Sequence, residues 1–178
     1  LQNRFGEKIS TSMGVPNGVA LDNKGRILVA DTENNRVLTF TSSGELVGEI
    51  IGCSDARLVE PTGVCCFNNG NIVIADRSES LLKLFGHDGR VIKTVGRERI
   101  TENDLYTLAY DSRSGFFAAD IWNAQVIHFK EDLEVQDIIR RPGKRLGQFG
   151  GVPGVAIFND SLYLADFENN RICIFKKH

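Results

Sequence analysis

The sequence lacks any hydrophobic run long enough to cross a bilayer. A membrane-spanning helix needs about 20 consecutive apolar residues, and no segment of the 178 residues approaches that length. Residues 1–10 also lack the apolar core of a signal peptide. We therefore expect no membrane segment. Because the chain starts at Leu1 rather than Met, we expect it to be part of a longer protein.

Residues of the kinds that build catalytic centres are also scarce. The three histidines are His87, His128 and His178. Since His87 is expected in an outer turn, they cannot form a three-histidine metal site. No nucleophile motif occurs, and Gly150-Gly151 is not followed by a phosphate-loop pattern. These absences predict a chain that is not an enzyme and that holds no metal and no cofactor.

The four cysteines, Cys53, Cys65, Cys66 and Cys173, show no metal-binding spacing. They have neither a C-x-x-C arrangement nor a nearby pair of histidines. Three of them lie in apolar runs, where cysteine behaves as a small hydrophobic residue. We expect four free thiols, which favour a reducing compartment, and we predict a cytoplasmic protein.

What the sequence does contain favours short strands. The chain is 42% hydrophobic and 25% charged, which is ordinary for a globular protein. It has 18 glycines and 11 phenylalanines but only 4 prolines. Such a mixture suits many short strands joined by tight turns. The composition therefore predicts an all-β fold.

The strongest pattern is an internal repeat. Four strand-like runs end on Asp, and the Asp positions are separated by 45, 44 and 46 residues. Sequence periods of about 40 to 50 residues with four short strands each are typical of β-propeller blades. The four runs are residues 27–31, 72–76, 116–120 and 162–166.

The repeat predicts one propeller domain over residues 1–178. Its blades are expected at residues 14–52, 59–96, 104–140 and 151–176. The fourth period stops after its third strand, whereas residues 1–5 resemble the end of a fourth strand. An N-terminal strand that completes the last blade would hide an exposed sheet edge. The four blades then form a small closed ring, or they are a fragment of a larger ring whose two open edges make a dimer possible.

Two of the periods resemble NHL repeats. The resemblance lies in residues 16–22 (PNGVALD) and 27–37 (ILVADTENNRV), in residues 153–157 (PGVAI) and 164–172 (LADFENNRI), and in the linker 143–149 (GKRLGQF). The second period is less similar, and the third has Leu105 in place of a Pro. The resemblance implies a propeller, usually of six blades, that binds protein or RNA. Such propellers are often the C-terminal domain of TRIM-NHL ubiquitin ligases.

Each repeat Asp has two interpretations. Four carboxylates could ring a calcium ion. Alternatively, an Asp at the exit of a strand accepts hydrogen bonds from the amides of the loop that follows. We favour the second interpretation. Arg36 and Arg171, which follow the motif in the first and fourth periods, would either hold these loops or contact a partner.

The third and fourth periods depart from the repeat in a way that indicates a binding surface. Trp122 and Phe167 stand in loops that are polar in the first period, and we expect both to be exposed. The linker 140–149 (RRPGKRLGQF) carries four positive charges and no acid, whereas the linkers 52–60 and 96–104 each have a net charge of −1. A structural alternative packs Trp122 and Phe149 between blades and leaves the charges solvated.

Cations beside aromatic rings suit two kinds of partner. Protein hot spots are enriched in Trp and Arg, and single-stranded RNA is bound by ring stacking and phosphate neutralisation. The net charge of −2 favours a protein partner, such as a ligase substrate, with single-stranded RNA as the alternative. Acids at positions 131, 132 and 134 are expected on the opposite face. The candidate binding residues are Arg36, Trp122, Arg141, Lys144, Arg145, Phe167 and Arg171.

Overall fold

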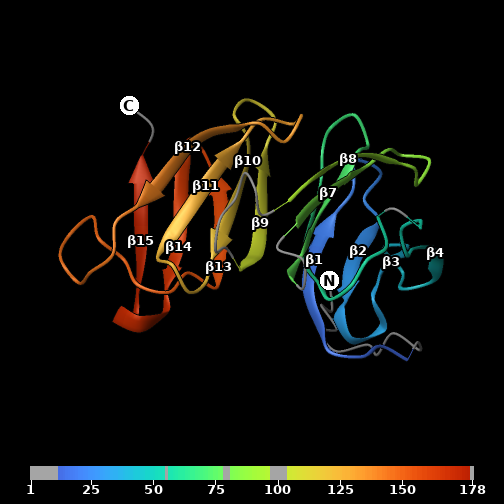
Figure 1. The fold of residues 1–178 in the computed structure, drawn as a ribbon, viewed down its shortest axis with the longest axis horizontal. Coiled ribbons are helices and arrows are strands. Elements are labelled where there is room, and N and C mark those ends of the chain that lie inside the picture. The colour runs from blue at the N-terminus through green and yellow to red at the C-terminus, as the bar shows by residue number, and fades with distance from the viewer. Residues whose placement is uncertain (1–11, 55, 78–80, 97–103, 177–178) are drawn as a thin grey trace, which may run out of the picture.

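The computed structural model describes residues 12–54, 56–77, 81–96 and 104–176 (Figure 1). The predicted all-β fold is confirmed, because these residues form four antiparallel sheets. Single-turn 3-10 helices such as η1 (Thr32–Asn34) and η3 (Phe167–Asn169) follow the second strand of a sheet. Within the described ranges, no helix has the length and apolar character needed to span a membrane.

Each sheet is one blade, with its strands paired in sequence order. Among the described residues, three blades have four strands and the last has three. Blade 1 comprises β1 (Pro16–Leu21), β2 (Ile27–Asp31), β3 (Arg36–Phe40) and β4 (Leu46–Ile50). Blade 2 comprises β5 (Pro61–Cys66), β6 (Ile72–Asp76), β7 (Leu81–Phe85) and β8 (Val91–Val95). Blade 3 comprises β9 (Leu105–Asp111), β10 (Gly115–Asp120), β11 (Gln125–Phe129) and β12 (Val135–Arg140). Blade 4 comprises β13 (Gly154–Phe158), β14 (Ser161–Asp166) and β15 (Arg171–Lys176).

Burial depends on the place of a strand in its blade. Strand β6 is buried along its whole length because neighbouring blades cover both of its faces. Strand β12, at the outer edge, is mostly exposed. The hairpin before β4 turns at Gly44, whose φ of 88° favours glycine and whose N–H donates to the carbonyl of Thr41 at 2.9 Å.

Successive blades pack through four positions that we call the front positions. They lie three and one residues before the repeat Asp and six and eight residues after it. In blade 1, the front residues Leu28, Ala30 and Val37 join one hydrophobic cluster with Val64 and Ile74 of blade 2. Because strand residues alternate between faces, the same spacing places front residues on the same face in every blade.

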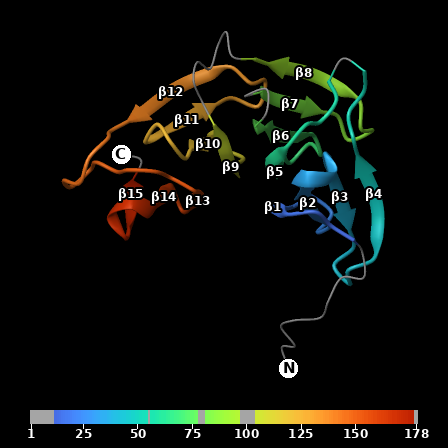
Figure 2. The same ribbon diagram turned by 60° about the horizontal axis from the view of Figure 1, so that its bottom comes forward.

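The four blades follow one another around an arc (Figure 2). Strand β1 contacts β5, β5 contacts β9, and β9 contacts β13. No hydrophobic cluster of the described residues joins blade 4 to blade 1. The described residues therefore form an open arc and not a closed ring of four blades. The closing strand expected at residues 1–5 lies outside the described residues.

The arc ends in two apolar sheet faces. The front residues Ile172 and Ile174 of blade 4 are 62% and 56% exposed, although Val126, the counterpart of Ile172 in blade 3, is fully buried. At the other end, Val19 of β1 is 69% exposed, whereas its counterpart Val64 in blade 2 is buried. Blade 4 thus exposes its front face at one end of the arc. At the other end, blade 1 exposes the opposite face of its sheet, which is the face that packs on a front face inside the arc.

Candidate binding surface

Each blade is organised around its buried repeat Asp. In blade 1, Asp31 accepts hydrogen bonds from the backbone N–H of Gly14 at 2.7 Å, from the side-chain amide of Asn34, and from Nε of Arg36 at 2.7 Å. One carboxylate therefore joins the entry to the blade, the loop and the third strand. Asp31 thus has a structural role, but its backbone donor is Gly14, before the blade, and its side chain does not cap the backbone of the loop that follows, contrary to the expectation from the sequence. Among the described residues, no three His, Cys, Asp or Glu side chains are grouped as metal ligands would be.

Blade 4 repeats this arrangement. Asp166 accepts from the N–H of Gly150 at 2.8 Å, from Nδ2 of Asn169 at 2.9 Å and from Nε of Arg171 at 2.8 Å. Burial alone would raise the pKa of Asp31 and Asp166. Hydrogen bonds to the charged form outweigh burial and hold the pKa of both carboxyls below the ordinary value.

Blade 2 supplies a different cation to its repeat Asp. Asp76 accepts from Nζ of Lys83 at 2.7 Å and from the N–H of Val59 at 2.7 Å, and the side chains of the ion pair are almost completely buried. The sequence has Leu81 where blade 1 has Arg36. Lys83 lies two residues further along the strand, so it can reach the carboxylate from the same face.

The loop that carries Trp122 is fixed by Asp120. This carboxylate accepts from the backbone N–H groups of Trp122 and Asn123, both at 3.0 Å, and from the side chains of Asn123 and Gln125. Here the predicted bonds from the following loop are confirmed. The indole of Trp122 is nevertheless 70% exposed, so a fixed backbone presents a large ring to solvent.

The basic linker is anchored through its backbone. Arg171 donates to the carbonyl oxygens of Lys144, Arg145 and Gln148 at 2.9, 3.1 and 2.5 Å, and Nδ2 of Asn169 donates to that of Gly143 at 3.0 Å. These contacts use carbonyl groups only. The side chains of Lys144 and Arg145 remain exposed, and neither is in an ion pair with any described residue. Arg171 therefore positions the linker.

Phe149 closes the linker against the core. Its ring is fully buried and makes a T-shaped contact with the Phe175 ring at a centroid distance of 5.9 Å. The guanidinium of Arg141 lies 5.9 Å from the centroid of the same Phe175 ring, within range of a cation–π contact. The inter-blade packing considered in the sequence analysis thus applies to Phe149 and not to Trp122.

The end of the linker lies between the two aromatic loops. A Cβ on Gly151 would stand 2.6 Å from the carbonyl oxygen of Ile121, which precedes Trp122. On the other side, the carbonyl of Gly151 accepts the N–H of Phe167 at 3.0 Å. Only glycine permits this close approach. Phe167, like Trp122, is exposed, at 72%.

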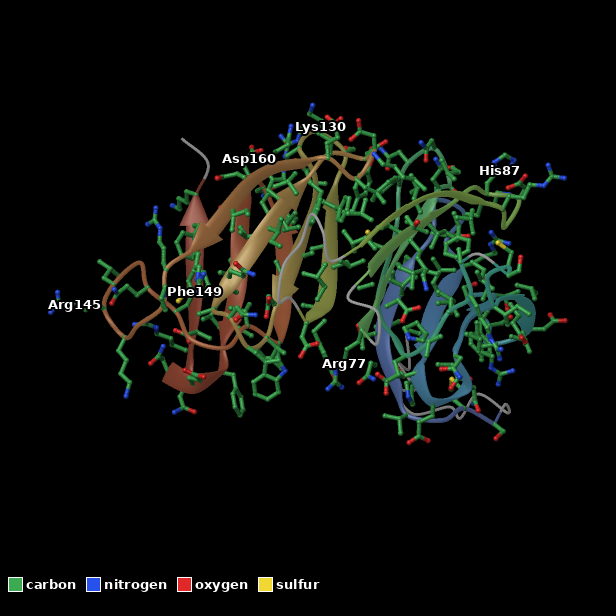
Figure 3. All side chains as sticks on the ribbon, viewed as in Figure 1. Arg77, His87, Lys130, Arg145, Phe149 and Asp160 are labelled. Atoms are coloured by element: carbon green, nitrogen blue, oxygen red, sulfur yellow. The ribbon has the colours of Figure 1, made fainter. Side chains whose placement is uncertain are left out.

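Sequence reasoning missed Leu146, which lies between Arg145 and Gly147 and is fully exposed. Its only sequence signal is an apolar residue at the tip of a charged linker. Arg145 projects outward from the same tip (Figure 3). We define the linker surface as Trp122, Lys144, Arg145, Leu146 and Phe167.

Charges around the linker surface are mixed. The side chain of Glu168 lies against Gly150 at the end of the linker, and this acid was not anticipated. The acids at positions 131, 132 and 134 were expected on the opposite face. They belong to the β11–β12 turn, which carries Lys130 and lies at the upper end of the molecule in Figure 3. Arg36 is not part of the surface, because it lies in blade 1 and binds Asp31, Glu49 and the carbonyl of Ser12.

The two histidines in the described residues lie in different blades. His87 is exposed in the β7–β8 turn. His128 lies on β11, where its ring stacks on Phe117 and its Nε2 is 2.5 Å from the carbonyl oxygen of Ser114.

Comparison with known proteins places the fold. Residues 13–40, which run from just before β1 to the end of β3, match the NHL repeat. No curated protein sequence matches the chain significantly. A chain of the nidogen/laminin complex is 18% identical with a TM-score of 0.71, over 94% of this chain and 62% of that one.

Two further solved structures are lyases. Virginiamycin B lyase from Staphylococcus aureus is 15% identical with a TM-score of 0.66, over 89% of this chain and 54% of that one. A catalytically inactive form of the same lyase with quinupristin is 13% identical with a TM-score of 0.69, over 96% and 58%. The chain therefore spans less than two thirds of these propellers, and the likeness concerns the fold alone. This chain is an all-β propeller of four blades, the first of which matches the NHL repeat over residues 13–40.

Proposed function

We propose that the chain is a non-catalytic binding platform that recruits a protein partner through the linker surface. The observation that carries the proposal is the exposure of three large apolar side chains, Trp122, Leu146 and Phe167, on backbone that is already fixed. Exposed apolar residues rimmed by charge mark interaction sites. A fixed backbone also lowers the ordering cost of binding.

The charges favour a protein over a nucleic acid. Arg171 is paired with Asp166, and Arg141 lies over an aromatic ring. Lys144 and Arg145 remain for a partner, and Glu168 lies at the end of the same linker, against Gly150. Two cations on a linker that ends at an acid can neutralise few phosphates, whereas they suit an acidic segment that also carries apolar side chains.

The nidogen/laminin complex, which contains a propeller of similar fold, lends support as an assembly between proteins. In a TRIM-NHL type protein, this platform would recruit the substrate of the ubiquitin ligase, and ligase chemistry would lie outside this chain. We place this function in the cytoplasm, because all four cysteines are free thiols.

The second candidate is single-stranded RNA. It is favoured by one observation, the exposed ring of Trp122 together with the exposed cations Lys144 and Arg145. Stacking of one base on an aromatic ring contributes about 1–3 kcal/mol, and cations add a salt-dependent term.

One experiment distinguishes the two candidates. Wild type and the double variant Trp122→Ala/Arg145→Ala are immobilised and offered cytoplasmic proteins and, separately, a random single-stranded RNA pool at low and physiological salt. The matched control is Ile138→Ala, which removes an exposed apolar side chain from β12. We expect wild type and control to retain the same protein, the double variant to lose it, and RNA to remain unbound at low salt.

Other outcomes replace the proposal. If RNA binds wild type, and the double variant binds it more weakly with a shallower salt dependence, the RNA candidate takes its place. If the double variant retains the same protein as wild type, the linker surface is not the binding site.

A further inference from the structure

A cavity of about 310 Å³ lies between blades 3 and 4. Its walls are Phe117 and His128 of blade 3 and Leu162 and Phe175 of blade 4. Asp160, in the β13–β14 turn, also lines it and lies at the end of the molecule away from η3 (Figure 3). The cavity is therefore separate from the linker surface. Its volume is at the lower end of the range for small-molecule sites.

The preceding interface explains why the space is empty. Between blades 2 and 3, the same place is filled by a cluster of aromatic rings. These are Phe67, Tyr110, Phe116 and Phe129. The residues at the equivalent positions between blades 3 and 4, one repeat later, are Asp111, Ile157, Leu162 and Phe175. Three aromatic rings are replaced by smaller or acidic side chains, so the cavity lies where aromatic rings are packed one interface earlier.

The blade 3 wall carries a stacked pair of rings and hydrogen-bond acceptors. The rings of Phe117 and His128 are stacked at 4.2 Å with an interplanar angle of 2°. Nε2 of His128 lies 2.5 Å from the carbonyl oxygen of Ser114, which places the proton on Nε2 and leaves Nδ1 as an acceptor in the neutral ring. Asp137 stands opposite His128 in the strand register and also lines the cavity.

The charges at the rim differ between the two walls. Asp160 of blade 4 is paired with Arg113 at 3.0 Å. Asp137 of blade 3 has no cationic partner among the described residues, and its Oδ1 accepts the N–H of Ile138. Lys176 contributes a positive charge from the blade 4 side. The blade 3 wall therefore favours a ligand that brings donors and positive charge.

We propose that this cavity binds a small aromatic amine. The ring occupies the volume that aromatic side chains fill one interface earlier and packs against the stacked rings of Phe117 and His128. The ammonium group donates toward Asp137 and gains from the neighbouring rings. The site goes beyond the proposed function, because it uses none of the residues of the linker surface.

The test uses 2-phenylethylamine as the probe and the His128 ring signals in NMR spectra of the whole chain as the readout. We expect saturable shifts, and we expect weaker binding of 2-cyclohexylethylamine, which has the same length but no aromatic ring. Leu162→Phe places in the cavity the residue that blade 3 has at this position, and it should weaken binding by at least about tenfold. Asp137→Asn should weaken binding as well.

The control is Glu134→Gln, an exposed carboxylate-to-amide change on the same hairpin that does not line the cavity. It should bind the probe as wild type does. The proposal is overturned if the probe causes no saturable shift, if the cyclohexyl compound binds equally well, or if Leu162→Phe binds as tightly as wild type. The comparison of the two amines on wild type decides the matter even if Leu162→Phe fails to fold.

Discussion

At the residue scale, the repeat Asp is constant and the group that neutralises it varies. Blades 1 and 4 use an Arg five residues after the Asp, whereas blade 2 uses Lys83, seven residues after it. Both positions lie on the same face of the third strand because side chains alternate along a strand. In blade 3, the donors to Asp120 include the side-chain amide of Gln125, which stands at the position of Arg36. The repeat Asp therefore accepts hydrogen bonds from different kinds of donor, provided that the buried carboxylate has hydrogen-bond partners.

Removing the cation of blade 2 should be costly. Lys83→Met takes the ion-pair partner from a fully buried carboxylate, and we expect a loss of about 3–5 kcal/mol in the free energy of unfolding. The double variant Leu81→Arg/Lys83→Leu restores the arrangement of blade 1 and should recover much of that loss. Urea unfolding measures both. A change below about 0.5 kcal/mol in Lys83→Met, the size usual for surface sites, would contradict this role.

The lowered pKa values of Asp31 and Asp166 predict sensitivity to acid. Their folded pKa lies below the unfolded value of about 3.9, so their stabilisation is fully present above that pH and is lost as the pH falls through the folded pKa. Asp31→Asn should lower stability at pH 7 and flatten the pH dependence between pH 5 and pH 2. The exposed Asp132→Asn serves as control and should leave the urea midpoint at every pH close to that of wild type.

At the scale of elements, the linker between blades 3 and 4 is a loop made rigid by one side chain. Three carbonyl groups converge on the guanidinium of Arg171, which also binds Asp166. A planar group with five donors can make these bonds together, whereas a lysine ammonium cannot reproduce the geometry. The exposure of Lys144 and Arg145 on a fixed loop depends on this contact.

Loss of Arg171 should release the linker. We expect Arg171→Ala to speed tryptic cleavage after Lys144 and Arg145 and to lower stability by about 1–3 kcal/mol. Arg171→Lys should rescue the cleavage rate only in part. Arg36→Ala is a matched control, because it removes the same bond to a repeat Asp in blade 1 without touching this linker. Equal cleavage of Arg171→Ala and wild type would show that the linker is held by other groups.

The sequence allowed the strands, the blade repeat and the exposure of the two aromatic loops to be predicted. Period, turn chemistry and a departure from a polar loop motif are local signals, so Trp122 and Phe167 could be found without coordinates. The anchoring of the linker could not be predicted, because it depends on carbonyl groups whose direction is set by the fold. Lys83 was missed because it stands in an apolar run, and its partner Asp76 lies on another strand.

At the scale of the whole molecule, the arc has two different apolar ends. One is the front face of blade 4, with Ile172 and Ile174, and the other is the β1 face of blade 1, with Val19 and Leu21. Front faces pack on such faces at all three interfaces inside the arc. A second copy can supply the missing mate at either end, in a head-to-tail contact.

We therefore expect the chain to self-associate. Sedimentation equilibrium should give an average mass that rises with concentration, and Ile172→Glu/Ile174→Glu should lower it toward the monomer. Changing the other end alone, with Val19→Glu, should have a similar effect because each contact uses one face of each kind. Ile92→Glu, at an exposed position of β8, is the control. A monomer at all concentrations would mean that the two faces do not fit each other.

The arc of blades also determines how the molecule comes apart. In the part of the chain that the structure describes, the extensive contacts of each blade are with its neighbours in sequence, so stability is close to a sum of blade and interface contributions, as in other repeat structures. Blade 4 has one neighbour and three strands, and it should open before blades 2 and 3 in hydrogen-exchange experiments. Arg171 and Phe167 belong to that blade. Partial unfolding would therefore release the linker surface while most of the molecule stays folded, so partner binding should fail at lower denaturant concentration than the fold itself.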